Sequence, residues 1–131
     1  MKIVHMSGKR KKSVARATLR EGKGKVRINK VPVETFMPML SRMKIMEPLT
    51  LAGDAVNNID IDVDVCGGGL SSQAEAARLA IGRALSRYDK KLEKVFLNYD
   101  RHLLVADVRR KEPAKPNCHG KARAKRQKSY R

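Results

Sequence analysis

One stretch of the sequence alternates without a break: Ile59-Asp60-Ile61-Asp62-Val63-Asp64-Val65. In an extended chain its four β-branched residues share one face and its three aspartates share the other, which is the period of a half-buried strand. The next segment, Gly67-Gly68-Gly69, ends that strand. Ser72 and Glu75 then match the S-x-x-E capping box, so we expect a helix from Ser72 to about Arg87.

The expected helix after the triple glycine has an apolar stripe that is rich in small residues. Apolar side chains recur there at helical spacing, which predicts a face turned toward a core. The small alanines would let the helix lie close to a sheet. The stripe consists of Leu70, Ala74, Ala77, Ile81, Ala84 and Leu85.

The N-terminal quarter of the chain predicts two strands. Ser13–Leu19 alternates, with Ala15, Ala17 and Leu19 on one face. A turn with two glycines follows at 20–24, and Lys25–Asn29 alternates again. We therefore expect a hairpin, whose outer face would be basic.

The segment between this hairpin and the aspartate-rich strand predicts helical turns. Val33–Leu40 is expected to form a short helix that Pro38 interrupts. A second helix over Leu49–Asn57 would open at Pro48, because proline is tolerated in a first turn. The methionines of this region are expected to fill the core rather than line a partner groove. They are Met37, Met39, Met43 and Met46.

The last third of the body predicts one more helix and one more strand. Asp89 can cap a helix whose inward residues would be Leu92, Val95 and Phe96. His102–Val108 is interpreted as a last strand. Strands and helices in this order indicate an α+β fold, with a single sheet and helices packed on one of its faces.

The charge of the chain is concentrated at its two ends. Among 131 residues, 30 Lys and Arg stand against 13 Asp and Glu, giving a net charge of +17. Residues 1–30 carry +10, residues 111–131 carry +7, and the residues between them are neutral. Residues 111–131 also lack Leu, Ile, Val and Phe. We therefore expect a body over residues 1–110 and an extended basic tail over 111–131.

Such a charge distribution calls for an anionic partner. Like charges repel one another in a compact chain, and a polyphosphate offsets them best because each neutralised phosphate releases a counterion. An anionic membrane would require an amphipathic helix beside the basic run, and the tail has none. No apolar run is long enough to span a membrane, and the basic N-terminus does not resemble a signal peptide. RNA is the favoured partner, because no DNA-binding motif is present.

The triple glycine permits more than one interpretation. Bare N–H groups at a helix N-terminus can hold a phosphate, and Gly67–Ser72 is similar to the phosphate loop of galactokinase-type enzymes. A tight strand-to-helix connection, with or without an RNA phosphate contact, is the favoured interpretation. The chain is short for such a kinase and shows no acid–base set. We therefore expect a protein that is not an enzyme.

The acidic and sulfur-bearing residues do not predict a metal centre. Asp60, Asp62 and Asp64 imitate the start of a calcium loop, but the required glycine is absent and a strand face explains them better. Cys66, Cys118 and His119 lack the paired spacing of a zinc site. Two cysteines are also too few for a disulfide framework, which favours a reducing, cytoplasmic compartment. No cofactor is expected.

Three segments in order resemble one known family. They are Gly8-Lys9-Arg10-Lys11-Lys12-Ser13-Val14-Ala15-Arg16-Ala17, Gly67-Gly68-Gly69-Leu70-Ser71-Ser72-Gln73-Ala74-Glu75-Ala76, and Lys121-Ala122-Arg123-Ala124-Lys125-Arg126-Gln127-Lys128-Ser129-Tyr130-Arg131. The chain resembles the universal small-subunit ribosomal protein nine family over nearly its whole length, in an archaeal-type form. The resemblance implies a fold like the second domain of ribosomal protein five of that subunit, including a left-handed β-α-β crossover that sequence patterns do not reveal.

The resemblance also implies a function in translation. It places such a chain in the head of the small subunit, beside other head proteins, with its tail reaching the anticodon stem-loop of the peptidyl-site transfer RNA. The expected tail tip is Lys128, Ser129, Tyr130 and Arg131. A free-standing RNA-binding chaperone that uses the same basic ends stays the alternative. The residues expected to bind ribosomal RNA are Lys9, Arg10, Lys11, Lys12, Arg16, Lys25, Arg27, Gly67, Gly68, Gly69, Arg109, Arg110, Lys121, Arg123, Lys125 and Arg126.

Overall fold

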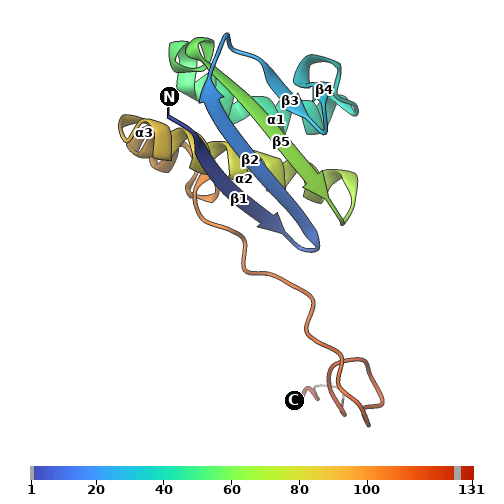
Figure 1. The fold of residues 1–131 in the computed structure, drawn as a ribbon. Coiled ribbons are helices and arrows are strands. Elements are labelled where there is room, and N and C mark those ends of the chain that lie inside the picture. The colour runs from blue at the N-terminus through green and yellow to red at the C-terminus, as the bar shows by residue number, and fades with distance from the viewer. Residues whose placement is uncertain (1, 126–127) are drawn as a thin grey trace.

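The computed structural model describes residues 2–125 and 128–131 and has an α+β fold, as predicted. Its sheet has five strands in the order β1-β2-β5-β3-β4, in which β3 and β5 are parallel and the other neighbours are antiparallel. The helices lie behind the sheet in Figure 1, which leaves the other face open. The strands are β1 (Val4–Arg10), β2 (Ser13–Glu21), β3 (Val26–Ile28), β4 (Val31–Pro32) and β5 (Ile59–Cys66). The α-helices are α1 (Met39–Ala52), α2 (Leu70–Tyr88) and α3 (Lys91–Tyr99), and 3-10 turns cover Val33–Thr35, Gly53–Asn58 and Arg101–Leu103.

The aspartate-rich strand β5 is confirmed and lies at the centre of the sheet. Ile59, Ile61, Val63 and Val65 are all buried against the helices. β5 pairs with β2 on one side and with β3 on the other. The predicted inward faces of these two neighbours are also confirmed, because Ala15, Ala17, Leu19, Val26 and Ile28 are buried.

The hairpin between β2 and β3 was a wrong prediction. β5 stands between the two strands, and the loop that joins them crosses the end of β5. The carboxylate of Asp60 holds that loop by accepting hydrogen bonds from the backbone N–H groups of Lys23 and Lys25, each at 2.9 Å. The hairpin that does form joins β2 to β1, a strand that no sequence pattern indicated. The two strands meet in a two-residue turn, where Lys11 has a φ of 52°.

Helix α2 begins at Leu70, two residues before the predicted start. Gly69 is the N-cap, and Ser72 lies one turn into the helix, with its hydroxyl 3.0 Å from the Gly69 nitrogen. Leu70 is 61% exposed, so it does not belong to the core stripe. The other five members of the predicted stripe are buried and pack against the sheet.

The region before β5 differs most from the expected helical turns. A single helix, α1, spans most of it, while Val33–Thr35 is only a 3-10 turn. Pro38 precedes α1 in an extended conformation and so starts the helix, whereas Pro48 lies inside it. The prediction that Met37, Met39, Met43 and Met46 fill the core was wrong, because their exposed fractions are 72%, 53%, 50% and 37%.

The end of the body is helical rather than extended. The N-cap of α3 is Lys90 rather than the expected Asp89, whose carboxylate accepts a hydrogen bond from the Lys91 nitrogen at 2.9 Å. Leu92 and Phe96 are buried, as expected. Val95 is 42% exposed, contrary to expectation. The predicted strand over His102–Val108 is absent, since the carboxylate of Asp100 caps a 3-10 turn there and residues 104–108 are irregular. Beyond them the chain runs away from the body (Figure 1).

Candidate nucleic-acid interface

Three distant segments meet at one end of the body and line a single groove. These are the β1–β2 turn, the glycine loop that leads into α2, and the chain as it leaves the body. The groove has a volume of about 920 Å³. Its lining residues are Lys9, Arg10, Lys11, Lys12, Gly68, Gly69, Ser71, Ser72, Glu75, Arg109, Arg110 and Lys111. We call it the basic groove.

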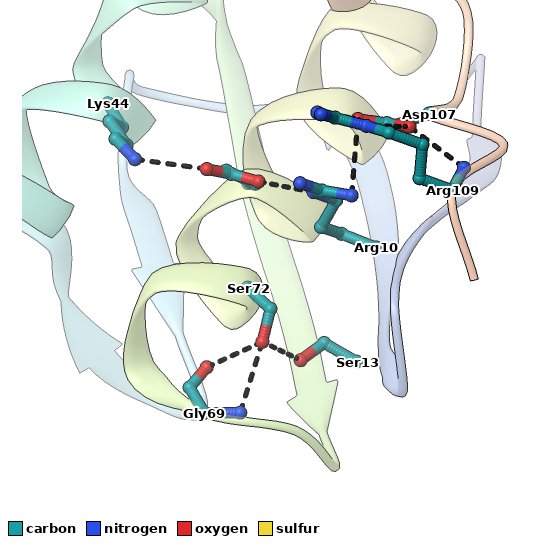
Figure 2. Close-up of polar contacts among 8 residues, drawn as sticks. Arg10, Ser13, Lys44, Gly69, Ser72, Asp107 and Arg109 are labelled. Carbon is teal, nitrogen blue, oxygen red and sulfur yellow. Dashed lines mark hydrogen bonds and ion pairs between the residues drawn. The ribbon is translucent and has the colours of Figure 1, made fainter. Parts of the chain in front are cut away.

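Hydrogen bonds from β2 hold the glycine loop in place. The buried hydroxyl of Ser13 forms a hydrogen bond with the Ser72 hydroxyl (Figure 2), at 2.9 Å. It also donates a hydrogen bond to the Gly67 carbonyl oxygen, at 2.9 Å. Gly68 has a φ of +67°, and a Cβ atom there would stand 2.0 Å from the Ser13 hydroxyl. Only glycine therefore fits at this position, where the loop passes directly over β2.

The N-terminus of α2 opens onto the basic groove. The first intrahelical hydrogen bond runs from the Gln73 nitrogen to the Gly69 carbonyl. The N–H groups of the three preceding residues have no partner inside the helix, and the helix dipole adds positive potential at this end. Because Ser71 and Gly69 line the basic groove, these donors lie beside its lysines. The arrangement is suited to hold a phosphate oxygen.

Two of the arginines in the basic groove are held by acids of the protein itself. Arg10 donates to Glu75 at 2.6 Å and lies 3.1 Å from Asp107, while Lys44 contacts the other oxygen of Glu75 at 3.1 Å (Figure 2). Arg109 also donates to Asp107, at 2.7 Å. Through Arg10, these contacts tie the irregular segment at Asp107 to β1 and α2. Glu75 and Asp107 offset most of the positive charge of Arg10 and Arg109. These two arginines therefore shape the groove more than they attract an anion.

The remaining cations of the basic groove are exposed. Among the residues that the structure describes, they form no ion pair within the protein. They are Lys9, Lys11, Lys12, Arg110 and Lys111, of which Lys111 was not among the predicted site residues. The groove therefore presents five cations beside a helix N-terminus.

The open face of the sheet is mixed in charge, not basic as predicted. Arg27 of β3 forms two hydrogen bonds with Asp62 of β5, at 2.8 and 3.1 Å, and Arg20 lies 3.9 Å from the same carboxylate. Arg16 of β2 lies opposite Asp64 in the β2–β5 register. The β5 aspartates thus offset the arginines on this face. Lys25 is exposed at its edge, close to Asp60.

The predicted tail residues lie outside the basic groove. Lys121, Arg123 and Lys125 are exposed, and so are Lys128 through Arg131, while Arg126 lies outside the described residues. Arg123 contacts Glu112 at 3.0 Å and Lys115 contacts it at 3.2 Å, which closes a loop within the tail. Hydrogen bonds from Lys115 and Arg123 lower the pKa of Glu112.

Comparison with known proteins identifies the family. A family model described as ribosomal protein S9/S16 matches residues 8–131. The chain belongs to the ribosomal protein S9/S16 family. It is 55% identical to the small ribosomal subunit protein uS9 of Methanococcus maripaludis strain C7, over all of both chains. It is 54% identical to the protein of the same name from Methanococcus vannielii, again over all of both chains.

Membership of the S9/S16 family decides between the functional hypotheses. The chain is a structural ribosomal protein and not an enzyme, so the similarity of its glycine loop to a kinase phosphate loop does not indicate kinase activity. The family also places it in the ribosome of the cytoplasm rather than as a free-standing chaperone. Among the described residues, no helix is long and apolar enough to cross a membrane. No group of three or more potential metal ligands occurs in that same part of the chain.

The acids that hold the basic groove should make the fold sensitive to acid. Burial would raise the pKa of Glu75, but the hydrogen bonds from Arg10 and Lys44 outweigh it and lower that pKa. The hydrogen bonds from Arg109 hold the pKa of Asp107 far below its usual value. A carboxylate with a lowered pKa in the folded state stabilises the fold above its unfolded pKa, and this stabilisation is lost as the pH falls through the folded pKa.

We therefore expect Glu75→Gln to lose less stability on acidification than the unmodified chain. Urea unfolding at pH 7 and at about pH 3, below the usual glutamate value, measures the difference for each protein. Glu93→Gln, on the exposed surface of α3, is the matched control and should follow the unmodified chain. If the Glu75 and Glu93 variants lost the same amount of stability on acidification, the acid-sensitive stability could not be assigned to the Glu75 carboxylate.

Proposed function

We propose that this S9/S16 protein is a constituent of the small ribosomal subunit that docks on ribosomal RNA through the basic groove. The relatives that match it over their full length carry the name of a small-subunit protein. One observation supports the docking site most strongly. Segments at 9–12, 68–72 and 109–111, far apart in sequence, converge on one groove with exposed cations and a helix N-terminus.

The chemistry of the basic groove suits the RNA backbone rather than the bases. Lysine ammonium groups and backbone N–H groups are donors that match phosphate oxygens, and they carry no information about base identity. Each phosphate that the groove neutralises releases a counterion, so binding should weaken steeply with salt. In this proposal Glu75 and Asp107 keep Arg10 and Arg109 in place, so that the exposed cations face the RNA.

For the rest of the predicted RNA-binding set, we propose contacts along the tail. Residues 1–110 form the docked body, and residues 111–131 run between RNA helices. Lys121, Arg123, Lys125 and Arg126 would neutralise phosphates there. Arg16, Lys25 and Arg27 lie on or beside the mixed face of the sheet, where they are partly offset by aspartates, so we expect them to contribute less.

We further propose that the tail tip contacts the anticodon stem-loop of the peptidyl-site transfer RNA in the subunit head. Support comes from the resemblance of the ending to that of the family, and from the exposed tip that follows the long run of chain beyond the body (Figure 1). Lys128 and Arg131 would contact phosphates, and Tyr130, whose side chain is 87% exposed, is available for stacking.

Removal of Lys128–Arg131 should leave assembly intact and weaken the holding of transfer RNA. Two exposed phosphate contacts are worth about 1 kcal/mol, so the peptidyl-site transfer RNA should dissociate roughly three to ten times faster. Filter binding on purified small subunits measures this rate, and sedimentation measures assembly. The matched control, Lys90→Gln with Lys94→Gln at and just before α3, removes two charges and should leave the rate unchanged. Unchanged dissociation from the truncated subunits would contradict the tail proposal without affecting the groove.

A further inference from the structure

Helix α1 is apolar on two faces, and the protein covers only one of them. Ile45, Leu49 and Ala52 are buried against the rest of the body. The other face carries Met39, Leu40, Met43 and Met46, which are 53%, 76%, 50% and 37% exposed. Apolar side chains that gather on an exposed helix face are normally covered by a partner. This helix is therefore only half covered in the isolated chain.

The exposed face of α1 continues onto two neighbouring helices. A hollow of about 480 Å³ lies between Leu40, Met43 and Leu70, at the start of α2. A second hollow, of about 380 Å³, lies between Met43, Met46 and Tyr99, at the end of α3. Leu70 and Tyr99 are themselves 61% and 57% exposed. Met43 lines both hollows, so the two form one surface, which we call the methionine surface.

The charged residues around the methionine surface are engaged by the protein itself. Lys44 is paired with Glu75 at 3.1 Å, and Glu47 is paired with Arg78. Arg42 donates a hydrogen bond to the Glu34 carbonyl at 2.6 Å. The surface is thus almost neutral, in a chain whose net charge is +17. It offers little to the RNA phosphates that the basic groove is suited to bind.

The charge of the chain also argues against a second copy as the occupant. Two chains of +17 would repel each other, and the methionine surface has no charge pattern that would offset this. A neutral apolar surface is complementary to a neutral apolar segment of a different protein. Methionine suits such a surface because its flexible, polarisable side chain adapts to a partner, and it is enriched at the cores of protein interfaces.

We propose that the methionine surface docks an apolar segment of another protein of the small subunit. Leu40 and Met43 form the centre of this interface, and Leu70 and Tyr99 close its two ends. The proposal goes beyond RNA docking, because it assigns a second surface and a different class of partner. It rests on the ribosomal family of the chain, and not on the groove or the tail contacts.

A photocrosslinker placed at position 43 tests the proposal in salt-washed, intact small subunits. Benzoylphenylalanine is introduced there, and at Val31 on β4 as the matched control, because Val31 is apolar and 44% exposed outside the surface. We expect position 43 to crosslink a defined apolar peptide of another small-subunit protein, identified by mass spectrometry, at least fivefold above the control. A crosslink to ribosomal RNA, to a second copy of the chain or to no partner above the control would overturn the proposal.

A pair of variants tests the same surface without a crosslinker. Leu40→Asp with Met43→Asp puts two charges on the surface at exposed positions, and Val31→Asp is the control. Quantitative mass spectrometry of the subunits should show the crosslinked partner reduced at least fivefold relative to the chain itself. An unchanged ratio would overturn the proposal. Loss of the chain together with its partner would show instead that α1 is needed for incorporation, and the crosslink from position 43 would then decide.

Discussion

Neutralising three cations of the basic groove should lower the affinity for small-subunit ribosomal RNA by roughly a hundredfold at 0.1 M salt. The variant combines Lys11→Gln, Lys12→Gln and Arg110→Gln, all at exposed positions without an ion pair among the described residues. Each neutralised phosphate adds about 0.9 to the slope of log affinity against log salt. The slope should therefore become shallower by about 2.7. Filter binding of the purified chain to transcribed ribosomal RNA, over a range of salt concentrations, measures both quantities.

A control with the same change of charge separates this site from the total charge of the chain. It combines Lys91→Gln and Lys94→Gln on α3 with Lys90→Gln at its N-cap, and Figure 1 places α3 at the opposite end of the body from the β1–β2 turn. If the groove is the docking site, this control should change the affinity by less than about threefold, the effect of long-range charge alone. Equal losses of affinity in the two triple variants would mean that RNA binding depends only on the net charge of the chain.

The central strand and the main helix could be predicted because their patterns are local. The alternation of β5 and the alanine stripe of α2 each mark the face of the element that is buried in the core. Each pattern can be recognised within a few consecutive residues. Strand pairing is not local in the same way. The hairpin prediction joined two strands that are neighbours in sequence, but Asp60 holds their connecting loop across the end of β5. That contact joins residues more than thirty positions apart, so it produces no periodic pattern in the sequence.

Strand β1 and helix α1 were missed or misplaced for opposite reasons. β1 reads Val4-His5-Met6-Ser7-Gly8-Lys9-Arg10, which has little hydrophobic alternation, because its inward positions include a glycine and an arginine. α1 is apolar on two faces, so no single stripe marks its core side. The methionines were therefore assigned to the core, although they lie on the exposed face of this helix.

The candidate site was predictable as a density of charge but not as an arrangement. Runs of lysine and arginine marked residues 9–12 and 109–110, and both line the basic groove. Which of these cations is available depends on acids that lie elsewhere in the sequence. Glu75 and Asp107 engage Arg10, while Lys11 and Lys12 project from the turn without such a partner among the described residues. The sequence had offered Glu75 only as a helix cap.

Gly8→Ala should destabilise the fold, because the structure has no space for a methyl group at this position. Gly8 lies in β1 directly beneath α2. A Cβ atom there would stand 2.4 Å from the Ala76 carbonyl oxygen and 2.7 Å from the Ala80 nitrogen. Both are backbone atoms of a helix interior, so the helix itself must move away from the sheet. Such overpacking costs about 1 to 3 kcal/mol, and a rigid backbone neighbour places the cost near the upper end.

The net loss should be smaller than the cost of the clash. Alanine restricts the unfolded chain more than glycine does, which returns about 0.4 to 1 kcal/mol. We therefore expect the free energy of unfolding to fall by about 2 kcal/mol, and urea unfolding followed by circular dichroism measures it. Gly69→Ala is the matched control, because a Cβ atom there meets nothing within 4 Å and its φ is −109°. It should change stability by less than about 1 kcal/mol.

A double variant tests whether the clash is with the helix backbone. Adding Ala80→Gly to Gly8→Ala removes a side chain from α2 but leaves the Ala80 nitrogen and the Ala76 carbonyl in place. Because these backbone atoms cause the clash, the double variant should be no more stable than Gly8→Ala, and a glycine inside the helix should cost about 1 kcal/mol more. Recovery of stability would mean that the strand is separated from the helix by side chains. The close approach of β1 to α2, which carries Arg10 to Glu75 and so shapes the basic groove, would then need another explanation.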